Sequence, residues 1–170
     1  MDTTANAQAE EQPRPHENTK PETSNRHPAP NAQRPTPTWM PTVLWLAAAY
    51  NILWGAWVVL FPLTAFQWLH MPLPNYPQVW QCVGMIVGVY GVGYACAALN
   101  PVEQWPIVLV GLLGKVCGPL GFITAVIQGT LPLRFGLLLL TNDFLWWIPF
   151  TLILIHTYKT KERPQKAAQK

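Results

Sequence analysis

Four long stretches of apolar residues constrain this chain more than any other feature of its sequence. They cover residues 42–62, 79–99, 105–127 and 135–155. A helix needs roughly 20 apolar residues to cross a hydrocarbon core about 30 Å thick, and backbone polar groups inside lipid must be satisfied within the protein. The sequence therefore predicts an all-α fold: an integral membrane four-helix bundle over residues 42–157, with the lipid bilayer as its first partner.

Charge is scarce in the chain, and its distribution supports the membrane prediction. Charged residues make up 11% of the sequence, against about 25% in ordinary soluble domains. Between residues 42 and 155 the formal charges are Glu103, Lys115, Arg134 and Asp143. Two of these, Lys115 and Asp143, fall near the middle of predicted spans, where an uncompensated charge is costly.

The two ends of the chain differ from the apolar middle. Residues 1–41 are rich in proline and polar residues, and they have too few large apolar side chains to offset the entropy of ordering. We expect them to form a disordered tail. They contain no apolar core of a secretory signal, so the first span is expected to be an uncleaved anchor. Residues 158–170 form a short basic tail.

Basic residues near the span ends predict the orientation in the membrane. Arg26 and Arg34 precede the first span, five basic residues follow the last span, and the opposite face offers only Arg134. Because positive residues stay on the cytoplasmic side, we expect both termini in the cytoplasm and the bundle in the cell (inner) membrane. The basic residues flank spans, which argues against a nucleic-acid partner.

Each span has one polar side chain near its centre. These side chains are Asn51, Tyr90, Lys115 and Asp143. Polar groups at this depth turn toward the bundle interior and partner one another, so they are expected to form one layer, with Asn142 beside it. The third and fourth spans are joined by a short turn and must be antiparallel, which places Lys115 and Asp143 at similar depth.

Two interpretations of this polar layer remain open. In the structural one, Lys115 and Asp143 form a buried ion pair that fixes the register of two spans. In the functional one, the same layer binds a proton, an ion or a polar headgroup. An ionisable residue inside a membrane is a functional candidate by default.

Small residues and prolines mark helix contacts and kinks. Six glycines at helical spacing are predicted packing positions: Gly84, Gly88, Gly111, Gly114, Gly118 and Gly121. Pro119 cannot donate to the carbonyl of Lys115, and Pro149 cannot donate to that of Leu145. Both prolines are therefore predicted kinks close to the polar layer.

Other chemistry finds little support in the sequence. No catalytic residue is assigned, because no nucleophile has a base at a suggestive spacing. Metal ligation lacks a Cys/His or carboxylate cluster, and no cofactor is predicted. The three cysteines, Cys82, Cys96 and Cys117, lie within apolar spans and indicate small core residues.

Four short motifs carry a family resemblance. They are Tyr-Asn-Ile-Leu-Trp-Gly at 50–55, Trp-Gln-Cys-Val-Gly-Met at 80–85, Gly114-Lys115 with Gly118-Pro119, and Thr-Asn-Asp at 141–143 followed by Trp-Trp-Ile-Pro at 146–149. The region 41–155 resembles a family of small four-span bacterial membrane proteins and, more distantly, the DoxX-like group. Some similar chains carry the label alkyl hydroperoxide reductase, but this sequence lacks a thioredoxin-like pattern and an exposed, electropositive cysteine. The resemblance implies fold and location, without an activity.

The sequence leaves three function classes in order of preference. The first is a non-enzymatic accessory subunit or polar-ligand-binding bundle centred on Lys115 and Asp143, with a membrane protein partner or a second copy as possible associates. The second is a small proton- or ion-coupled transporter that uses the same residues. The third is a membrane-embedded redox or lipid enzyme.

Overall fold

The computed structural model describes residues 36–168, with side chains through Glu162. Residues 1–35, which hold most of the predicted disordered tail, lie outside the described residues. The elements in chain order are α1 (Trp39–Leu60), α2 (Thr64–Trp68), α3 (Pro77–Leu99), α4 (Trp105–Ile127), η1 (Leu133–Phe135), α5 (Gly136–Leu139), η2 (Leu140–Phe144) and α6 (Leu145–Ala168). The described part contains no strand, and the all-α prediction is confirmed.

Four helical segments are long and apolar enough to cross a membrane. They are Trp39–Leu60, Pro77–Leu99, Trp105–Ile127 and Leu133–Glu162. The last segment is composite, because it joins η1, α5, η2 and α6 end to end. The chain is therefore a small multi-pass membrane protein whose outer surfaces contact lipid.

Helix ends follow the local sequence. Prolines lie in the first two positions of α3 and α4, where a backbone N–H would be unpaired in any case. α4 ends at Ile127 and is followed two residues later by Gly129, which has a φ of 70°. The Gly129 N–H donates to Val126 O and the Thr130 N–H donates to Ala125 O, each at 2.9 Å, a Schellman ending in which glycine supplies the left-handed conformation.

The boundaries of the two predicted tails differ from the observed helices. α1 begins at Trp39, three residues before the predicted span, and α6 continues to Ala168. The basic segment that was predicted as a separate tail from residue 158 is thus a continuation of α6. Hydropathy marks where a helix leaves the lipid, but helical hydrogen bonding continues wherever the residues permit it.

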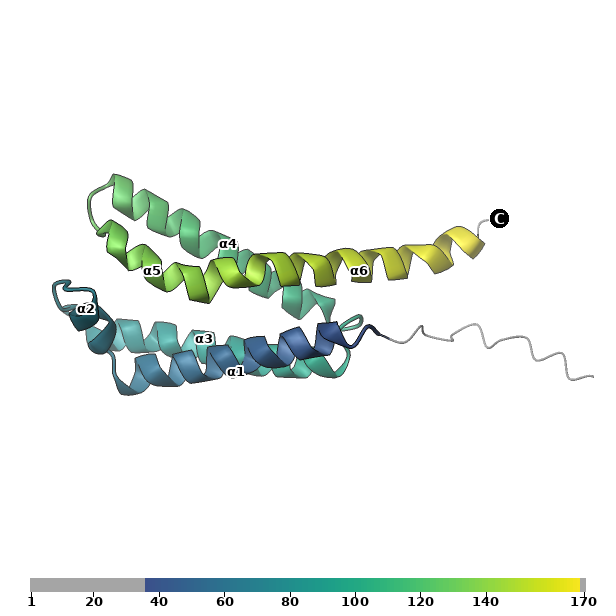
Figure 1. The fold of residues 1–170 in the computed structure, drawn as a ribbon, viewed down its shortest axis with the longest axis horizontal. Helices are drawn as coiled ribbons and strands as arrows, with labels where there is room; N and C mark the ends of the chain where they lie inside the picture. The colour runs from purple at the N-terminus through teal and green to yellow at the C-terminus, as the bar shows by residue number, and fades with distance from the viewer. Residues whose placement is uncertain (1–35, 169–170) are drawn as a thin grey trace, which may run out of the picture. The chain divides into compact units, whose positions relative to one another are not determined.

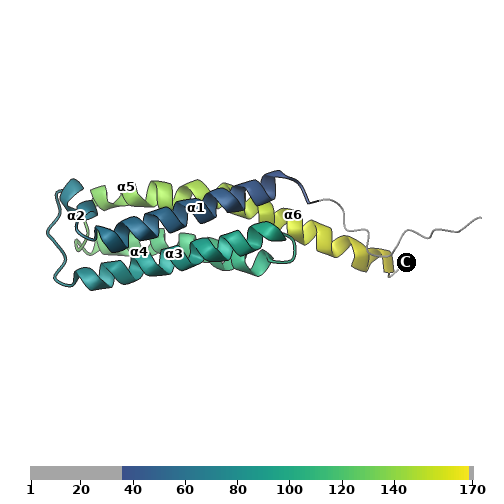
Figure 2. The same ribbon diagram turned by 90° about the horizontal axis from the view of Figure 1, so that it is seen from below.

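The long helices form two antiparallel hairpins (Figures 1 and 2). α1 packs against α3 along most of its length, and α4 packs against the composite helix of α5, η2 and α6. Contacts between the hairpins, α3 with α4 and α1 with α6, are much sparser. All four helices meet in one apolar core, which includes Met40, Leu44, Tyr94, Ala97, Val108, Phe150 and Ile153.

Glycines explain the close approach of α1 and α3. A Cβ on Gly55 would lie 2.5 Å from Gly84 O and 2.9 Å from Gly88 N. A Cβ on Gly91 would lie 2.9 Å from Ala48 O. The two backbones are therefore in direct contact, and only hydrogen fits between them.

The four glycines predicted on the packing face of the third span differ in their surroundings. A Cβ on Gly111 would clash with the Tyr94 hydroxyl, and one on Gly118 would lie 3.7 Å from the Asp143 carboxylate. A Cβ on Gly114 or Gly121 would meet nothing within 4 Å among the described residues. Each of these two is three residues after a glycine that has a close neighbour, which rotates it by about 60° around the helix from that glycine.

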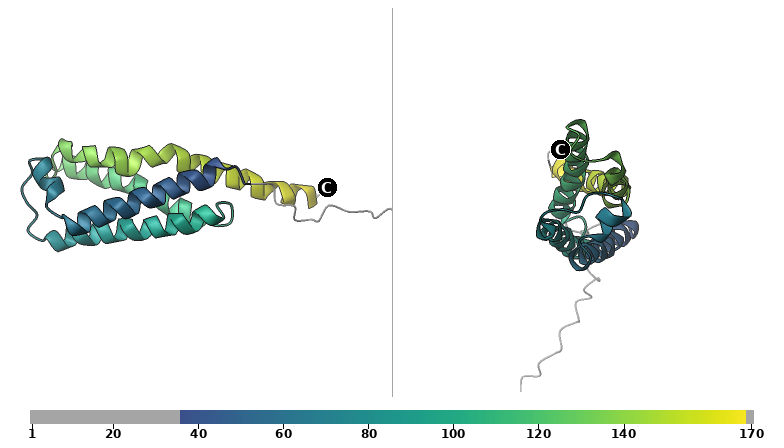
Figure 3. Two further views of the ribbon diagram at one scale, coloured as in Figure 1. Left: turned by 60° about the horizontal axis from the view of Figure 1, so that its bottom comes forward. Right: turned by 90° about the vertical axis from the view of Figure 1, so that its left-hand side faces the viewer.

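The short helix α2 lies at the end of the bundle away from the chain's C-terminus (Figure 3). Aromatic rings hold it there: Trp68 stacks on Trp57 of α1 at 5.5 Å, and Phe66 meets Trp80 of α3 edge-on at 5.5 Å. At the same end the Arg134 guanidinium donates to the His70 carbonyl at 2.6 Å. The arginine thus joins η1 to the loop that follows α2.

Candidate functional site

Two buried charged residues and an asparagine form a cluster between α4 and η2. Lys115 and Asp143 are each 5% exposed. The Lys115 ammonium donates to the backbone carbonyl of Asn142 at 2.5 Å, and the Asn142 amide Nδ2 donates to Asp143 Oδ1 at 3.2 Å. Asn142 therefore connects the two charges.

Lys115 and Asp143 do not form a direct ion pair in this structure. Among the described side chains, the ion pair within 4.0 Å joins Lys161 and Glu103 at 3.5 Å. The Asp143 carboxylate lies instead against Gly118, one turn along α4 from Lys115. The two charges are close enough to interact electrostatically.

A turn of π-helix presents the acidic side of the cluster. η2 is a five-residue π-helix that contains both Asn142 and Asp143. Such turns insert an extra residue into an α-helix and occur frequently at functional sites. The sequence prediction placed the break in this span at Pro149 and missed the π-helix. The run of three polar residues, Thr141 to Asp143, in an otherwise apolar span was the available signal.

Two tryptophans satisfy backbone carbonyls around the cluster. Pro119 leaves the Lys115 carbonyl without its helical donor, and the Trp147 indole N–H donates to that carbonyl at 3.1 Å. The neighbouring Trp146 indole N–H donates to the Thr141 carbonyl at 3.1 Å. The two indole nitrogens therefore supply donors to carbonyls beside the proline of α4 and in the π-helix.

The cluster has hydrogen-bonding capacity that the described residues leave unused. An ammonium carries three donors and a carboxylate about four acceptor sites. Among the described residues, the Lys115 ammonium donates one hydrogen bond and the Asp143 carboxylate accepts one. The Asn142 Oδ1 atom is buried and has no partner within the described part of the chain. Buried polar atoms are normally paired, so this one marks a place where a polar group would be favourable.

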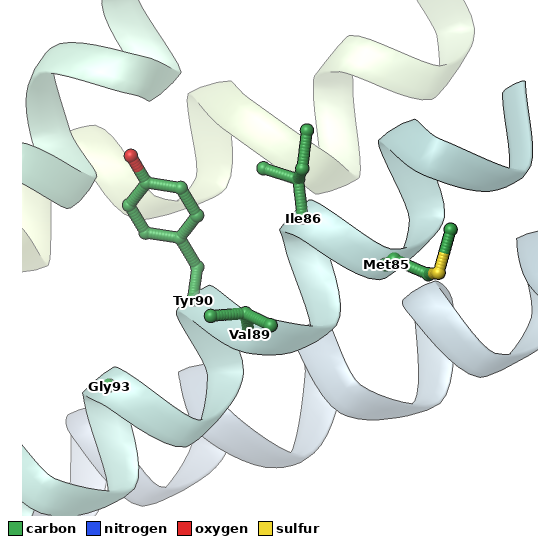
Figure 4. Close-up of a pocket in the computed structure, with 5 residues that line it drawn as sticks. All are labelled: Met85, Ile86, Val89, Tyr90 and Gly93. Atoms are coloured by element: carbon green, nitrogen blue, oxygen red, sulfur yellow. The ribbon is translucent and has the colours of Figure 1, made fainter. Parts of the chain in front are cut away.

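The other two members of the predicted layer lie outside this hydrogen-bonded cluster. Asn51 is buried, but its amide donates at 2.7 Å to the Ala47 carbonyl of its own helix. Tyr90 is half-buried, and its ring lies 6.3 Å from that of Tyr94. It lines a shallow apolar groove on α3 together with Met85, Ile86, Val89 and Gly93 (Figure 4).

Two further tyrosines lie near the cluster, and sequence reasoning missed both. Tyr94 is 1% exposed, and its ring packs edge-on against Phe150 at 5.0 Å. The Tyr50 hydroxyl donates to Thr141 Oγ1 at 2.9 Å and so joins α1 to η2. Tyr94 is one helical turn after Tyr90, which places both on the same side of α3.

No group of three or more His, Cys, Asp or Glu residues that could hold a metal ion occurs within residues 36–168. The cysteines at 82, 96 and 117 are free thiols on the exposed side of their helices. The predicted core role of the cysteines is therefore wrong. An exposed face in this bundle is a face toward lipid, where a small, weakly polar thiol is tolerated.

Comparisons with protein-family models, curated proteins and solved structures found no match. The family resemblance described above therefore stays a prediction from the sequence motifs.

Proposed function

We propose that this protein binds a small polar ligand, without chemically transforming it, at the cluster of Lys115, Asn142 and Asp143. One observation carries the proposal: a buried ammonium, a buried carboxylate and an unpaired amide oxygen lie together with unused hydrogen-bonding capacity. A purely structural pair would be expected to use that capacity internally.

The chemistry of the cluster defines the class of ligand. Lys115 requires an acceptor or an anion, whereas Asp143 and Asn142 Oδ1 require a donor or a cation. A small zwitterion, or a polar headgroup with both an ammonium and an acidic oxygen, satisfies both requirements at once. A simple anion or cation would satisfy only one side of the cluster.

Thermal unfolding of the purified protein with a ligand panel tests the proposal. The panel contains zwitterions, amines, carboxylates and inorganic phosphate. A ligand at 100 times its Kd stabilises the folded state by about 2.7 kcal/mol, so a binding zwitterion should raise the unfolding temperature of the wild type. The shift should disappear in Asp143→Asn and in Lys115→Gln.

Thr124→Val is the matched control, because Thr124 is also on α4 but its hydroxyl donates within its own helix, to Gly121 O at 2.7 Å. This variant should retain the full shift. A shift that survives in both Asp143→Asn and Lys115→Gln would place the ligand elsewhere. A charge swap, Lys115→Asp with Asp143→Lys, that retained the same shift would show that no fixed polarity is required.

A proton- or ion-coupled transporter is the second candidate, and the sparse contact between the two hairpins favours it. Alternating access requires one half of a bundle to move against the other around a central site. A transporter should show ion-dependent uptake into vesicles that Asp143→Asn abolishes while the variant still inserts normally. Uptake that is unchanged in Asp143→Asn would contradict this role.

We further propose a cell (inner) membrane location with both termini in the cytoplasm, supported by the basic residues around residues 26–34 and 159–170. We also propose that the chain belongs to a family of small four-span membrane proteins distantly related to the DoxX-like group, and that it associates with a membrane protein partner or a second copy. Single cysteines at positions 130 and 160, in a background without the native thiols, test the orientation. An impermeant reagent applied to whole cells should label position 130 and leave position 160 unlabelled.

A further inference from the structure

A groove opens between the start of α4 and residues 154–161 of α6, and the Lys115 cluster does not line it. Its walls are apolar, with Trp105 and Leu109 from α4 and Leu154 and Ile155 from α6. The groove has a volume of about 390 Å³, within the range of roughly 300–1,000 Å³ that ligand sites occupy. Because its walls belong to membrane-spanning helices, a hydrocarbon chain can reach the groove directly from the bilayer.

Thr157 lines the same groove and supplies an unpaired polar group. It is 2% exposed, and its hydroxyl is buried without a hydrogen-bond partner among the described residues. A threonine inside a helix commonly donates to the carbonyl one turn earlier, and Thr160 does so with His156 O at 2.9 Å. The Thr157 hydroxyl is therefore available to an oxygen of a bound molecule after a small rearrangement.

Two lysines form the rim of the groove. Lys161 lies 3.5 Å from Glu103, which partly neutralises it. Lys159 also lines the groove and has no ion pair within 4.0 Å among the described side chains. The other acidic residue on this stretch of α6 is Glu162, which interacts with Tyr158. Lys159 is thus the rim charge left for an incoming anion.

We propose that this groove binds an anionic phospholipid, with an acyl chain along the apolar walls and the phosphate at Lys159, near the Thr157 hydroxyl. Basic pockets between membrane helices recognise such headgroups because the acyl chain and the phosphate find matching surfaces at one depth. Trp105 is at the first position of α4, as expected for a residue at the level of the headgroups. The inference does not depend on the proposed function.

Lipid titration of the purified full-length protein in detergent tests the proposal. Phosphatidylglycerol, phosphatidylcholine and inorganic phosphate are compared, with bound lipid counted by native mass spectrometry. Phosphatidylglycerol should bind the most tightly, and inorganic phosphate alone should bind weakly because the walls contribute nothing to it. Lys159→Gln should weaken phosphatidylglycerol binding about five-fold, the effect of one lysine near a lipid phosphate.

Two further variants distinguish lipid binding in the groove from general attraction of lipid by the positive charge of the C-terminal segment. Lys166→Gln removes the same charge from the same basic segment, seven residues further along the chain, and it should weaken binding less than two-fold. Leu109→Trp fills the groove and keeps every charge, and it should weaken binding at least as much as Lys159→Gln. Each variant is first shown to unfold at the wild-type temperature without added lipid; where Leu109→Trp does not, Leu154→Phe replaces it.

Three results would overturn the proposal. Equal losses in Lys159→Gln and Lys166→Gln would show that the basic segment attracts lipid as a whole. Unchanged binding in the groove-filling variant would show that the walls hold no acyl chain. Equal binding of phosphatidylcholine and phosphatidylglycerol would show that the headgroup charge is not recognised.

Discussion

The α1–α3 hairpin and the α4–α6 hairpin hold two apolar helices together by different means. In the first, Gly55, Gly84 and Gly91 let the backbones touch, and contact extends along the whole pair. In the second, contact is sparser, and two hydrogen bonds join the helices: the Lys115 ammonium donates to the Asn142 carbonyl, and the Trp147 indole N–H donates to the Lys115 carbonyl.

This difference indicates that the bundle has a rigid half, the α1–α3 hairpin, and an adaptable half, the α4–α6 hairpin. Close van der Waals packing between membrane helices has few alternative arrangements, because any shift opens a gap. Polar contacts around a π-helix can exchange partners, and ligands or water can complete them. The hairpin with the π-helix carries the proposed binding site, and the glycine-packed hairpin lies beside it.

The largest effect is expected from removing the charge at the centre of the adaptable half. Lys115→Met leaves the Asn142 carbonyl without its donor and the Asp143 carboxylate without a nearby cation. We expect a loss of about 3 kcal/mol in the free energy of unfolding, measured by SDS-induced unfolding of the purified protein. The double variant Lys115→Met with Asp143→Leu should recover more than half of it. A double variant less stable than the single one would argue against electrostatic coupling.

The second largest effect on stability is expected from a change in the rigid half. Gly55→Ala places a methyl group 2.5 Å from Gly84 O, so the helices must separate, and we expect unfolding to become easier by about 2 kcal/mol. Gly114→Ala is the control, because a Cβ there meets nothing within 4 Å. It should leave stability unchanged or raise it by up to about 1 kcal/mol. Similar losses in both variants would remove the distinction between the two hairpins.

A double-mutant cycle tests the indole support of α4. Trp147→Phe removes the donor to the Lys115 carbonyl and should cost about 1 kcal/mol. Pro119→Ala restores a backbone N–H that can donate to the same carbonyl. The tryptophan substitution should therefore cost less in the Pro119→Ala background. Additive effects in the unfolding measurements would show that the indole does not replace the missing backbone donor.

The smallest effect concerns a link between the two hairpins. Tyr50→Phe removes the hydrogen bond from α1 to Thr141 of η2, and interhelical hydrogen bonds in membranes are worth about 0.6 kcal/mol on average. Thr141→Val should cost a similar amount, and the pair of changes should cost little more than either one alone. If the proposed ligand requires this link, Tyr50→Phe will lower the free energy of ligand binding by more than it lowers the free energy of unfolding.

Much of the fold follows from hydropathy, whereas the details of the site do not. The four spans and the burial of Lys115 and Asp143 are expected from where apolar and charged residues fall. The layer of four polar residues was predicted from depth alone, and depth does not specify which way a side chain points. Asn51 accordingly donates a hydrogen bond within its own helix, whereas the Asn142 carbonyl accepts the hydrogen bond from Lys115.

The sequence by itself determined the class of protein and the depth of its charges, because the cost of polar groups in hydrocarbon allows few solutions. The tertiary structure decided the rest: which glycines face a neighbour, where a turn of π-helix forms, and which indole reaches which carbonyl. These features depend on the rotation of each helix about its axis, set by packing between residues far apart in the chain. A difference of 60° in that rotation separates Gly118, against a carboxylate, from Gly121, with open space beside it.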